Sequence, residues 1–156
     1  MAVTSLQAAK YACDVSGWTL TNLKLQKLLY LAHMIYSGRH GQPLIEDERF
    51  QAWNYGPVLP NVYRRASTFG AGPIKNVFHS VSDIPTDRAE AELIKAVVER
   101  FSSIPAFKLV ELTHDQAGAW AKCFSTGSRN VDIPQAAIES EYQRRFPNGN
   151  SQVTNG

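Results

Sequence analysis

The segment "NLKLQKLLYLAHMIYS", residues 22–37, constrains the fold most strongly, because its apolar residues lie on two sides of one helix. At about 100° per residue, they form two stripes that are nearly opposite each other. One stripe comprises Leu25, Leu28, Leu29, Ala32, Ile35 and Tyr36, and the other comprises Leu23, Tyr30 and Met34. A helix with two apolar faces packs on both sides, so we predict that it is the central element of the fold.

Two lysines, Lys24 and Lys27, interrupt this pattern on the strip that joins the two apolar faces. Their aliphatic stems can cover carbon surface while their ammonium groups reach the solvent, and we favour this interpretation. Alternatively, the strip is open to a partner whose carboxylates or phosphates accept hydrogen bonds from the ammonium groups.

Further helices are predicted where apolar residues recur at helical spacing between capping residues, prolines and glycines. Around the central helix, which should run from Asn22 to about Arg39, the expected helical ranges are 5–14, 60–70, 87–102, 105–114, 117–124 and 134–146. Thr86 is expected to cap the helix at 87–102. In the next helix, 105–114, the apolar residues are Phe107, Val110 and Leu112. The final helix should bury Ala137, Ile138 and Tyr142.

Extended structure is expected in three places. In the pieces 44–46 and 50–53, the apolar residues do not recur at helical spacing. The segment "PIKNVFHSVSDIP", residues 73–85, is rich in β-branched and aromatic residues. We therefore predict a mainly α (α+β) fold: a compact domain of about six to seven helices around a central helix, with a small antiparallel β-sheet or hairpin. The domain should span residues 1–146, followed by a mobile tail at 147–156.

Composition excludes several classes of protein. The two cysteines, Cys13 and Cys123, are 110 positions apart and lack CxxC spacing, which argues against a disulfide framework or a zinc site. The net charge is only +2, without a dense basic run. There is no signal-peptide pattern and no apolar run of about 18 residues. We expect a cytoplasmic protein that makes no membrane contact.

Candidate catalytic residues are few. The chain contains no Walker A, GxGxxG or GxSxG motif. His33 and His40 lack metal-ligand spacing, and both cysteines should pack as small hydrophobes. An enzymatic alternative would centre on His114 with Asp115 and Glu111, but an adjacent His-Asp pair is a weak catalytic signal. We favour a helix-boundary role, in which Thr113 or Asp115 caps the next helix. The acidic turn at residues 46–48 should be a solvated loop. We predict no catalytic residue, no metal and no cofactor.

The stretch "AWNYGPVLPNVY" is the strongest candidate for partner binding. Gly56 before Pro57 must be extended or in a turn, and the prolines stiffen a loop that carries Trp53, Tyr55 and Tyr63. Rigid aromatic groups serve as anchors in protein interfaces. The alternative is that Trp53 and Tyr55 fill the space between the central helix and the sheet, and both roles are compatible.

Three motifs in order, "LTNLKLQKLLYLAH", "GQPLIEDERFQAWNYGPVLPNVYRRASTFG" and "LVELTHDQAGAW", show a family resemblance. The chain resembles the Panacea-domain family, also called antitoxin SocA-like or phage-associated GepA-like proteins, over about residues 6–146. The resemblance implies a mainly helical domain from bacteria or phages that neutralises a toxin and is not an enzyme. The family signatures fall on Asn22, Lys24, Leu25, Lys27, Leu28, Tyr30, Trp53, Tyr55, Gly56, Pro57, Val58, Tyr63, Leu112, Thr113, His114 and Trp120.

The resemblance also gives a functional hypothesis. It implies a cytoplasmic antitoxin that binds a cognate toxin encoded next to it, with Lys24, Lys27, Tyr30, Trp53, Tyr55, Pro57 and Tyr63 as candidate partner-binding residues. Because the two lysines recur in the family signature, they belong to a shared site or a shared internal ion pair. Asn22, Leu25, Gly56, Thr113, His114 and Trp120 have structural or functional roles. Ala119 and Asn54 depart from the family, which commonly has a proline and a basic residue there.

An alternative is a phage-associated accessory protein that binds nucleic acid or a host complex. The candidate phosphate contacts are Arg64, Arg65, Arg144 and Arg145. We expect no appended DNA-binding domain, so nucleic-acid binding by this domain alone is not our main prediction.

Overall fold

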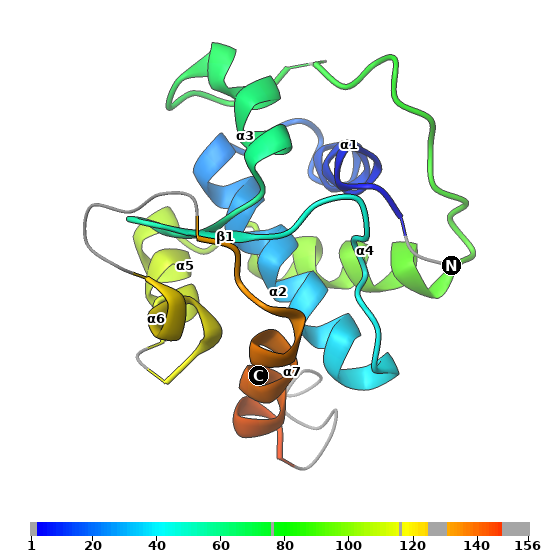
Figure 1. Ribbon diagram of the computed structural model, residues 1–156. Helices are drawn as coiled ribbons and strands as arrows, with labels where there is room; N and C mark the ends of the chain where they lie inside the picture. The colour runs from blue at the N-terminus through cyan, green and yellow to red at the C-terminus, as the bar shows by residue number, and fades with distance from the viewer. Residues whose placement is uncertain (1–2, 76, 116, 125–130, 148–156) are drawn as a thin grey trace.

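The computed structural model describes residues 3–75, 77–115, 117–124 and 131–147 (Figure 1). Within these ranges, seven α-helices, one 3-10 turn and one two-stranded antiparallel sheet are present, which confirms the mainly helical fold with a small sheet. The elements are α1 (Ser5–Val15), α2 (Asn22–His40), β1 (Gln51–Trp53), β2 (Gly56–Val58), α3 (Pro60–Ala66), η1 (Ser67–Phe69), α4 (Ala89–Phe101), α5 (Ala106–Thr113), α6 (Ala119–Cys123) and α7 (Gln135–Arg145).

Helix α2 is the central element, as predicted. It runs through the middle of the molecule, and α1, α3, α4, α5 and α7 pack against it (Figure 1). The Thr21 hydroxyl accepts a hydrogen bond from the Lys24 amide (3.2 Å) at its start, and left-handed Gly41 ends it. All side chains from Leu25 to Ser37 are buried, so the two apolar faces reflect a helix that is enclosed on every side.

The crossing of α2 and α7 depends on a glycine. A Cβ atom at Gly38 would overlap the aromatic ring of Tyr142, which is buried on α7. The absence of a side chain therefore lets the two helices approach closely. Ile138 is buried on the same helix as predicted, whereas Ala137 is only half-buried.

The acidic turn at residues 46–48 contributes to the fold. A carboxylate oxygen of Asp47 accepts a hydrogen bond from the Ser5 amide (2.7 Å), and one of Glu48 accepts from the Asn61 amide (3.0 Å). Each carboxylate thus lies at the start of a helix, α1 or α3, where the helix dipole favours negative charge. The prediction of a merely solvated loop was incomplete.

The sheet differs from the prediction. Only one predicted extended piece, 50–53, contributes a strand, β1. Its partner β2 lies at Gly56–Val58, where we expected Gly56 to be extended or in a turn but predicted no strand. Segment 44–46 forms an isolated bridge between Ile45 and Val3. In the described part of 73–85 there is no strand; Ile74, Phe78 and Ile84 are buried against the helices along the connection from α3 to α4. Burial in the core explains the apolar content that resembled a strand.

One predicted helix cap was wrong. Helix α4 begins at Ala89 with Arg88 at the N-cap position and without a side-chain cap, so Thr86 does not cap it. Helix α5 buries Leu109 and Thr113, whereas Phe107 is 63% exposed. The predicted tail, apart from Pro147, lies outside the described residues. Among the described residues, none of the helices combines the length and apolarity needed to cross a membrane.

Candidate functional site

The β1–β2 hairpin lies against α2 and α5, and its inner face covers Lys27. The Lys27 side chain is 0% exposed, and its Nζ atom donates a hydrogen bond to the carbonyl oxygen of Pro57 (3.0 Å). Burial lowers the pKa of Lys27 from 10.5 to about 7. No described acidic side chain forms an ion pair with it. Both the solvent-reaching lysine and the internal ion pair are therefore wrong for Lys27.

Lys24 lies one turn earlier and has a different environment. It is half-buried, and its Nζ atom donates to the carbonyl oxygen of Ser102 (2.9 Å) beyond the end of α4. Both lysines thus bind backbone carbonyl groups from distant segments. Only Lys24 keeps access to the surface.

Gly56 brings the hairpin backbone directly onto this site. Its φ angle is 111°, and a Cβ atom there would lie 2.9 Å from Lys27 Nζ and 3.0 Å from Thr113 Oγ1. Positive φ and the lack of space both require glycine. The signature residue Thr113 is buried, and its hydroxyl donates to carbonyl oxygens within α5.

His114 and Trp120 complete the support of the hairpin. Their rings stack with centroids 3.7 Å apart, and the Trp120 indole N–H donates to the carbonyl oxygen of Trp53 (2.7 Å). Burial, and secondarily the charge on Lys27, lowers the pKa of His114, while the backbone of Tyr55 opposes this shift. We call Lys27, Thr113, His114 and Trp120 the hairpin support.

The positions of His114 and Asp115 do not support the enzymatic alternative. His114 Nε2 is buried and has no hydrogen-bond partner among the described residues, and Asp115 forms its interactions elsewhere. The Asp115 carboxylate forms ion pairs with Arg144 and Arg145 of α7, and it accepts a hydrogen bond from the Ala117 amide (3.1 Å). Asp115 therefore joins the segment after α5 to α7. The N-cap residue of α6 is Gly118, without a side-chain cap, so the expected capping of this helix by Thr113 or Asp115 is wrong.

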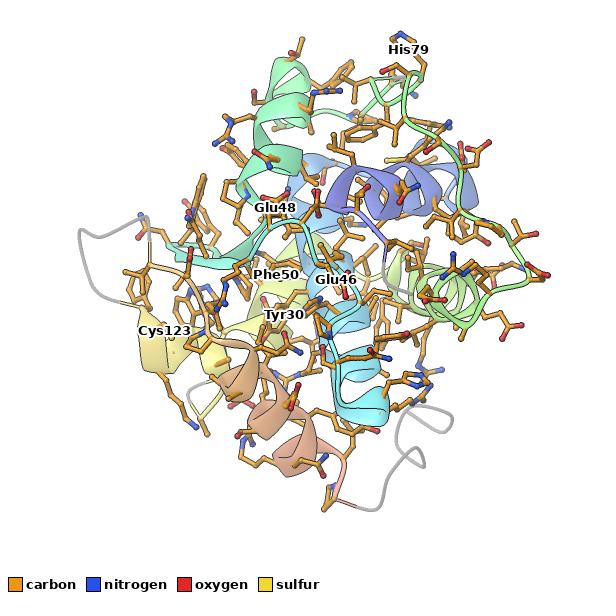
Figure 2. All side chains as sticks on the ribbon, turned by 45° about the vertical axis from the view of Figure 1, so that its right-hand side comes forward. Tyr30, Glu46, Glu48, Phe50, His79 and Cys123 are labelled. Carbon is orange, nitrogen blue, oxygen red and sulfur yellow. The ribbon has the colours of Figure 1, made fainter. Side chains whose placement is uncertain are left out.

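A buried carboxylate that sequence reasoning missed, Glu141, lies where α2, α6 and α7 meet. Glu141 accepts hydrogen bonds from the Tyr30 hydroxyl (2.7 Å) and the Ala119 amide (2.9 Å), and it pairs with Arg145 (3.1 Å). Burial and this carboxylate raise the pKa of Tyr30 well above its usual value. Phe50 packs edge-on against Tyr30 in the centre of the molecule (Figure 2). The available sequence signal was spacing: Glu141 lies next to Tyr142 and three residues after Ile138, and both of these residues were predicted to be buried.

The outer face of the hairpin borders a pocket of about 420 Å³. Tyr55 is 68% exposed, and Tyr63 is 37% exposed and packs edge-on against Trp53 with ring centroids 4.9 Å apart. The residues around the pocket come from the start of α2, the hairpin, α3, the segment after η1 and the start of α5. They are Thr21, Asn22, Leu23, Gln26, Trp53, Asn54, Tyr55, Val58, Tyr63, Gly70, Ala71 and Ala106.

Amide side chains connect the elements that surround this pocket. Gln26 accepts a hydrogen bond from the Leu59 amide (2.8 Å) and donates to Asn22 (3.0 Å). Asn22 in turn donates to the carbonyl oxygen of Tyr63 (3.2 Å). The signature residue Asn22 therefore joins α2 to α3. Gln26, which sequence reasoning did not select, joins α2 to the exit of the hairpin.

The structure divides the predicted partner-binding residues into two groups. Tyr55 and Tyr63 are exposed, and Trp53 and Lys24 are half-buried, so these four remain candidates for direct contact. Lys27, Tyr30 and Pro57 are buried and can act only by supporting the surface. Leu25 is a core residue.

The arginines of the nucleic-acid alternative are also separated. Arg64 and Arg65 are exposed on α3, whereas Arg144 and Arg145 lie on α7 and pair with Asp115. His33 and Cys13 are buried, and burial raises the pKa of the Cys13 thiol to about 12. The burial of Cys13 fits its predicted packing as a small hydrophobe. His33 is a structural residue, since its ring forms hydrogen bonds with Gln135 and the Ile45 amide.

The comparisons with known proteins agree on one family. The family described as "Antitoxin SocA-like, Panacea domain" matches residues 25–121, which include most of α2, the hairpin and the hairpin support. A curated relative, "Antitoxin SocA" from Caulobacter vibrioides (strain NA1000 / CB15N), is 36% identical over 136 residues, covering 81% of this chain and 72% of the relative. No solved structure matches the chain. The chain therefore belongs to the SocA-like antitoxin family that is defined by the Panacea domain.

Proposed function

We propose that this protein is an antitoxin that neutralises a cognate toxin by direct protein–protein binding and catalyses no reaction. Family membership and the name of the relative support the antitoxin role. The observation that carries the binding mode is the hairpin, which presents Tyr55 and Tyr63 on its outer face while its inner face is held by the hairpin support. Binding alone is sufficient for neutralisation.

The held hairpin favours tight binding for a physical reason. Association costs free energy whenever loops and side chains become ordered at the interface, so a preordered surface retains more of the contact energy. Two interactions, from Lys27 to Pro57 and from Trp120 to Trp53, fix the hairpin before any partner arrives. Aromatic side chains on such a surface are typical energetic centres of interfaces that bury roughly 800 Å² per partner.

Strand addition is a less suitable binding mode, because neither edge of the sheet is free. On the outer edge of β1, the Ala52 amide donates to Val131 (2.9 Å), and the Ile133 amide donates to Phe50 (2.8 Å). Along β2, the Pro57 carbonyl is occupied by Lys27. A partner must therefore bind to side chains on the outer face.

Co-expression with the product of the neighbouring gene tests this proposal. We expect restored growth of cells that express the toxin, together with a complex that survives copurification. A hairpin variant such as Tyr55→Ala should weaken both, whereas Lys95→Ala, a change at an exposed position on α4, should weaken neither. Failure of the wild-type protein in both assays, with every adjacent gene product, would contradict the proposal.

A further inference from the structure

The pocket beside the hairpin has an unusual balance of chemistry. Among the residues that the structure describes, its lining contains no Asp, Glu, Lys, Arg or His. Its surface is mainly apolar, and its lining includes three aromatic residues, Trp53, Tyr55 and Tyr63, and two aliphatic ones, Leu23 and Val58. A phosphate or a carboxylate would lose its hydration there without gaining an opposite charge, and an ammonium group would gain only cation–π attraction to the rings, about 0.5–1 kcal/mol at exposed sites. The lining therefore favours an uncharged group.

The polar side chains inside the pocket, as distinct from its rim, already form hydrogen bonds within the protein. Gln26 uses its oxygen for the Leu59 amide and its nitrogen for Asn22, while the Asn22 nitrogen is used for the Tyr63 carbonyl. The indole N–H of Trp53 donates to Gln51 (3.1 Å). Among the described residues, no buried polar side-chain atom of the pocket lacks a hydrogen-bond partner. A strongly polar ligand would have to break these bonds, whereas an apolar group would leave them intact.

The rim differs from the interior. Asn54 is exposed between Trp53 and Tyr55, and the exposed tyrosine rings carry hydroxyl groups. An apolar centre with a polar rim is the common anatomy of protein interfaces. The volume, about 420 Å³, lies near the lower end of the roughly 300–1,000 Å³ of small-molecule pockets, so it has room for one large side chain.

We infer that this pocket receives one uncharged apolar side chain, aliphatic or aromatic, that projects from the toxin. The inference rests on the proposed antitoxin function and deepens it, since it names the chemistry of the toxin's contact. The toxin side chain lies between the rings of Tyr55 and Tyr63, above the amide groups of Asn22 and Gln26. It binds by displacing water from apolar surface without forming an ion pair.

Filling the pocket from its rim tests the inference. Ala71 is an exposed lining residue, and Ala106 is a half-buried one at the start of α5. Ala71→Trp and Ala106→Phe add a ring at the rim without removing an existing side-chain contact. We expect each to raise the Kd for the purified toxin at least tenfold. The matched control is Ala136→Trp, because Ala136 is exposed on α7 and lines none of the described pockets; its Kd should change less than threefold.

A second measurement identifies the occupant. Apolar surface residues of the toxin are replaced by Ala one at a time, and each variant is titrated against the wild-type antitoxin and against Ala71→Trp. One toxin variant should lose at least tenfold in affinity for the wild type and little further for Ala71→Trp, because both changes abolish the same contact. Thermal unfolding of each antitoxin variant verifies that it is folded, and Ala106→Phe replaces Ala71→Trp if the latter is not.

The measurements distinguish failure of the proposed function from failure of the inference alone. If the wild-type protein binds no toxin, the proposed function fails, and the inference fails with it. If the wild type binds but both rim variants bind equally well, the pocket is empty in the complex and only the inference is overturned. The same conclusion follows if the side chain that couples to Ala71→Trp is charged, or if Ala136→Trp weakens binding as much as Ala71→Trp does.

Discussion

The two faces of the β1–β2 hairpin share six strand residues but have opposite chemistry. On the inner face, the Pro57 carbonyl covers a buried amine, and the Gly56 backbone lies against Lys27 and Thr113. On the outer face, Tyr55 extends into solvent beside an uncharged pocket. The difference teaches that motif residues of one short segment can serve separate purposes: the inner ones determine stability, and the outer ones are available for binding. Substitutions on the two faces can test this division.

The largest effect is expected for the pH dependence of stability at Lys27. Its pKa is about 7 in the folded protein, against 10.5 for an exposed lysine, so the folded state binds fewer protons between these pH values. The cost of burying the amine is fully present below pH 7 and is relieved as the pH rises toward 10.5. The free energy of unfolding should therefore gain up to about 5 kcal/mol from this group over that window.

Lys27→Met tests this expectation, because it keeps the length of the side chain and removes the titrating group. Urea unfolding at a series of pH values from 6 to 10.5 should show a much flatter profile for Lys27→Met than for the wild type. Lys24→Met is the matched control, since Lys24 is half-buried on the same helix. Equal pH profiles for Lys27→Met and the wild type would contradict a buried, uncompensated amine.

The next largest effect is expected at Glu141, which supports the inner face indirectly. Its carboxylate binds the Ala119 amide at the start of α6, and Trp120 in that helix holds the Trp53 carbonyl. Glu141→Ala leaves the Tyr30 hydroxyl without its partner and removes one of the two carboxylates that pair with Arg145, the other being Asp115. We expect a loss of about 4 kcal/mol in the free energy of unfolding, measured in urea. Glu139→Ala, on the same helix and only half-buried, should lose less than about 1 kcal/mol.

A third effect separates backbone strain from close contact at Gly56. Gly56→Ala introduces a Cβ atom at a φ of 111° within 3.0 Å of Thr113 and closer to Lys27, so we expect about 3 kcal/mol of destabilisation. Gly41→Ala is the control, because Gly41 also has positive φ, 68°, but has no neighbouring atom within 4 Å of the added Cβ. It should cost about 1 kcal/mol. Similar losses for both variants in thermal unfolding would show that the hairpin does not press on its support.

These residues also show how far sequence reasoning can reach. Helix α2 was predictable in full, because Thr21, Gly41 and two apolar faces are local signals. The burial of Lys27 was not predictable, since its partner is a backbone carbonyl 30 positions away that leaves no mark in a side-chain pattern. A pattern also does not distinguish a buried connection from a strand, which is why residues 73–85 were misassigned.

Sequence reasoning selected the residues of the candidate site, but it did not predict which of them face inward and which face outward. The loop and its aromatic residues were identified from rigidity and ring content, and the family resemblance added Thr113, His114 and Trp120. Which of them face inward depends on how α5 and α6 pack against the hairpin, and this is a tertiary property. Helix α5 illustrates the point: Phe107 is exposed, and the neighbouring Leu109 is buried, although both are apolar.

The smallest effect on stability, and the clearest test of the outer face, is expected for Tyr55→Ala. Since the Tyr55 side chain is 68% exposed, its removal should change the free energy of unfolding by less than about 0.5 kcal/mol. If Tyr55 is an anchor, the same change should weaken toxin binding by about 2 kcal/mol, or roughly thirtyfold in Kd. Phe107→Ala is a matched control, because Phe107 is 63% exposed and lines none of the described pockets. Calorimetric titration should show a weaker complex for Tyr55→Ala alone. Unchanged affinity together with lost stability would place Tyr55 with the inner face and remove the distinction between the two.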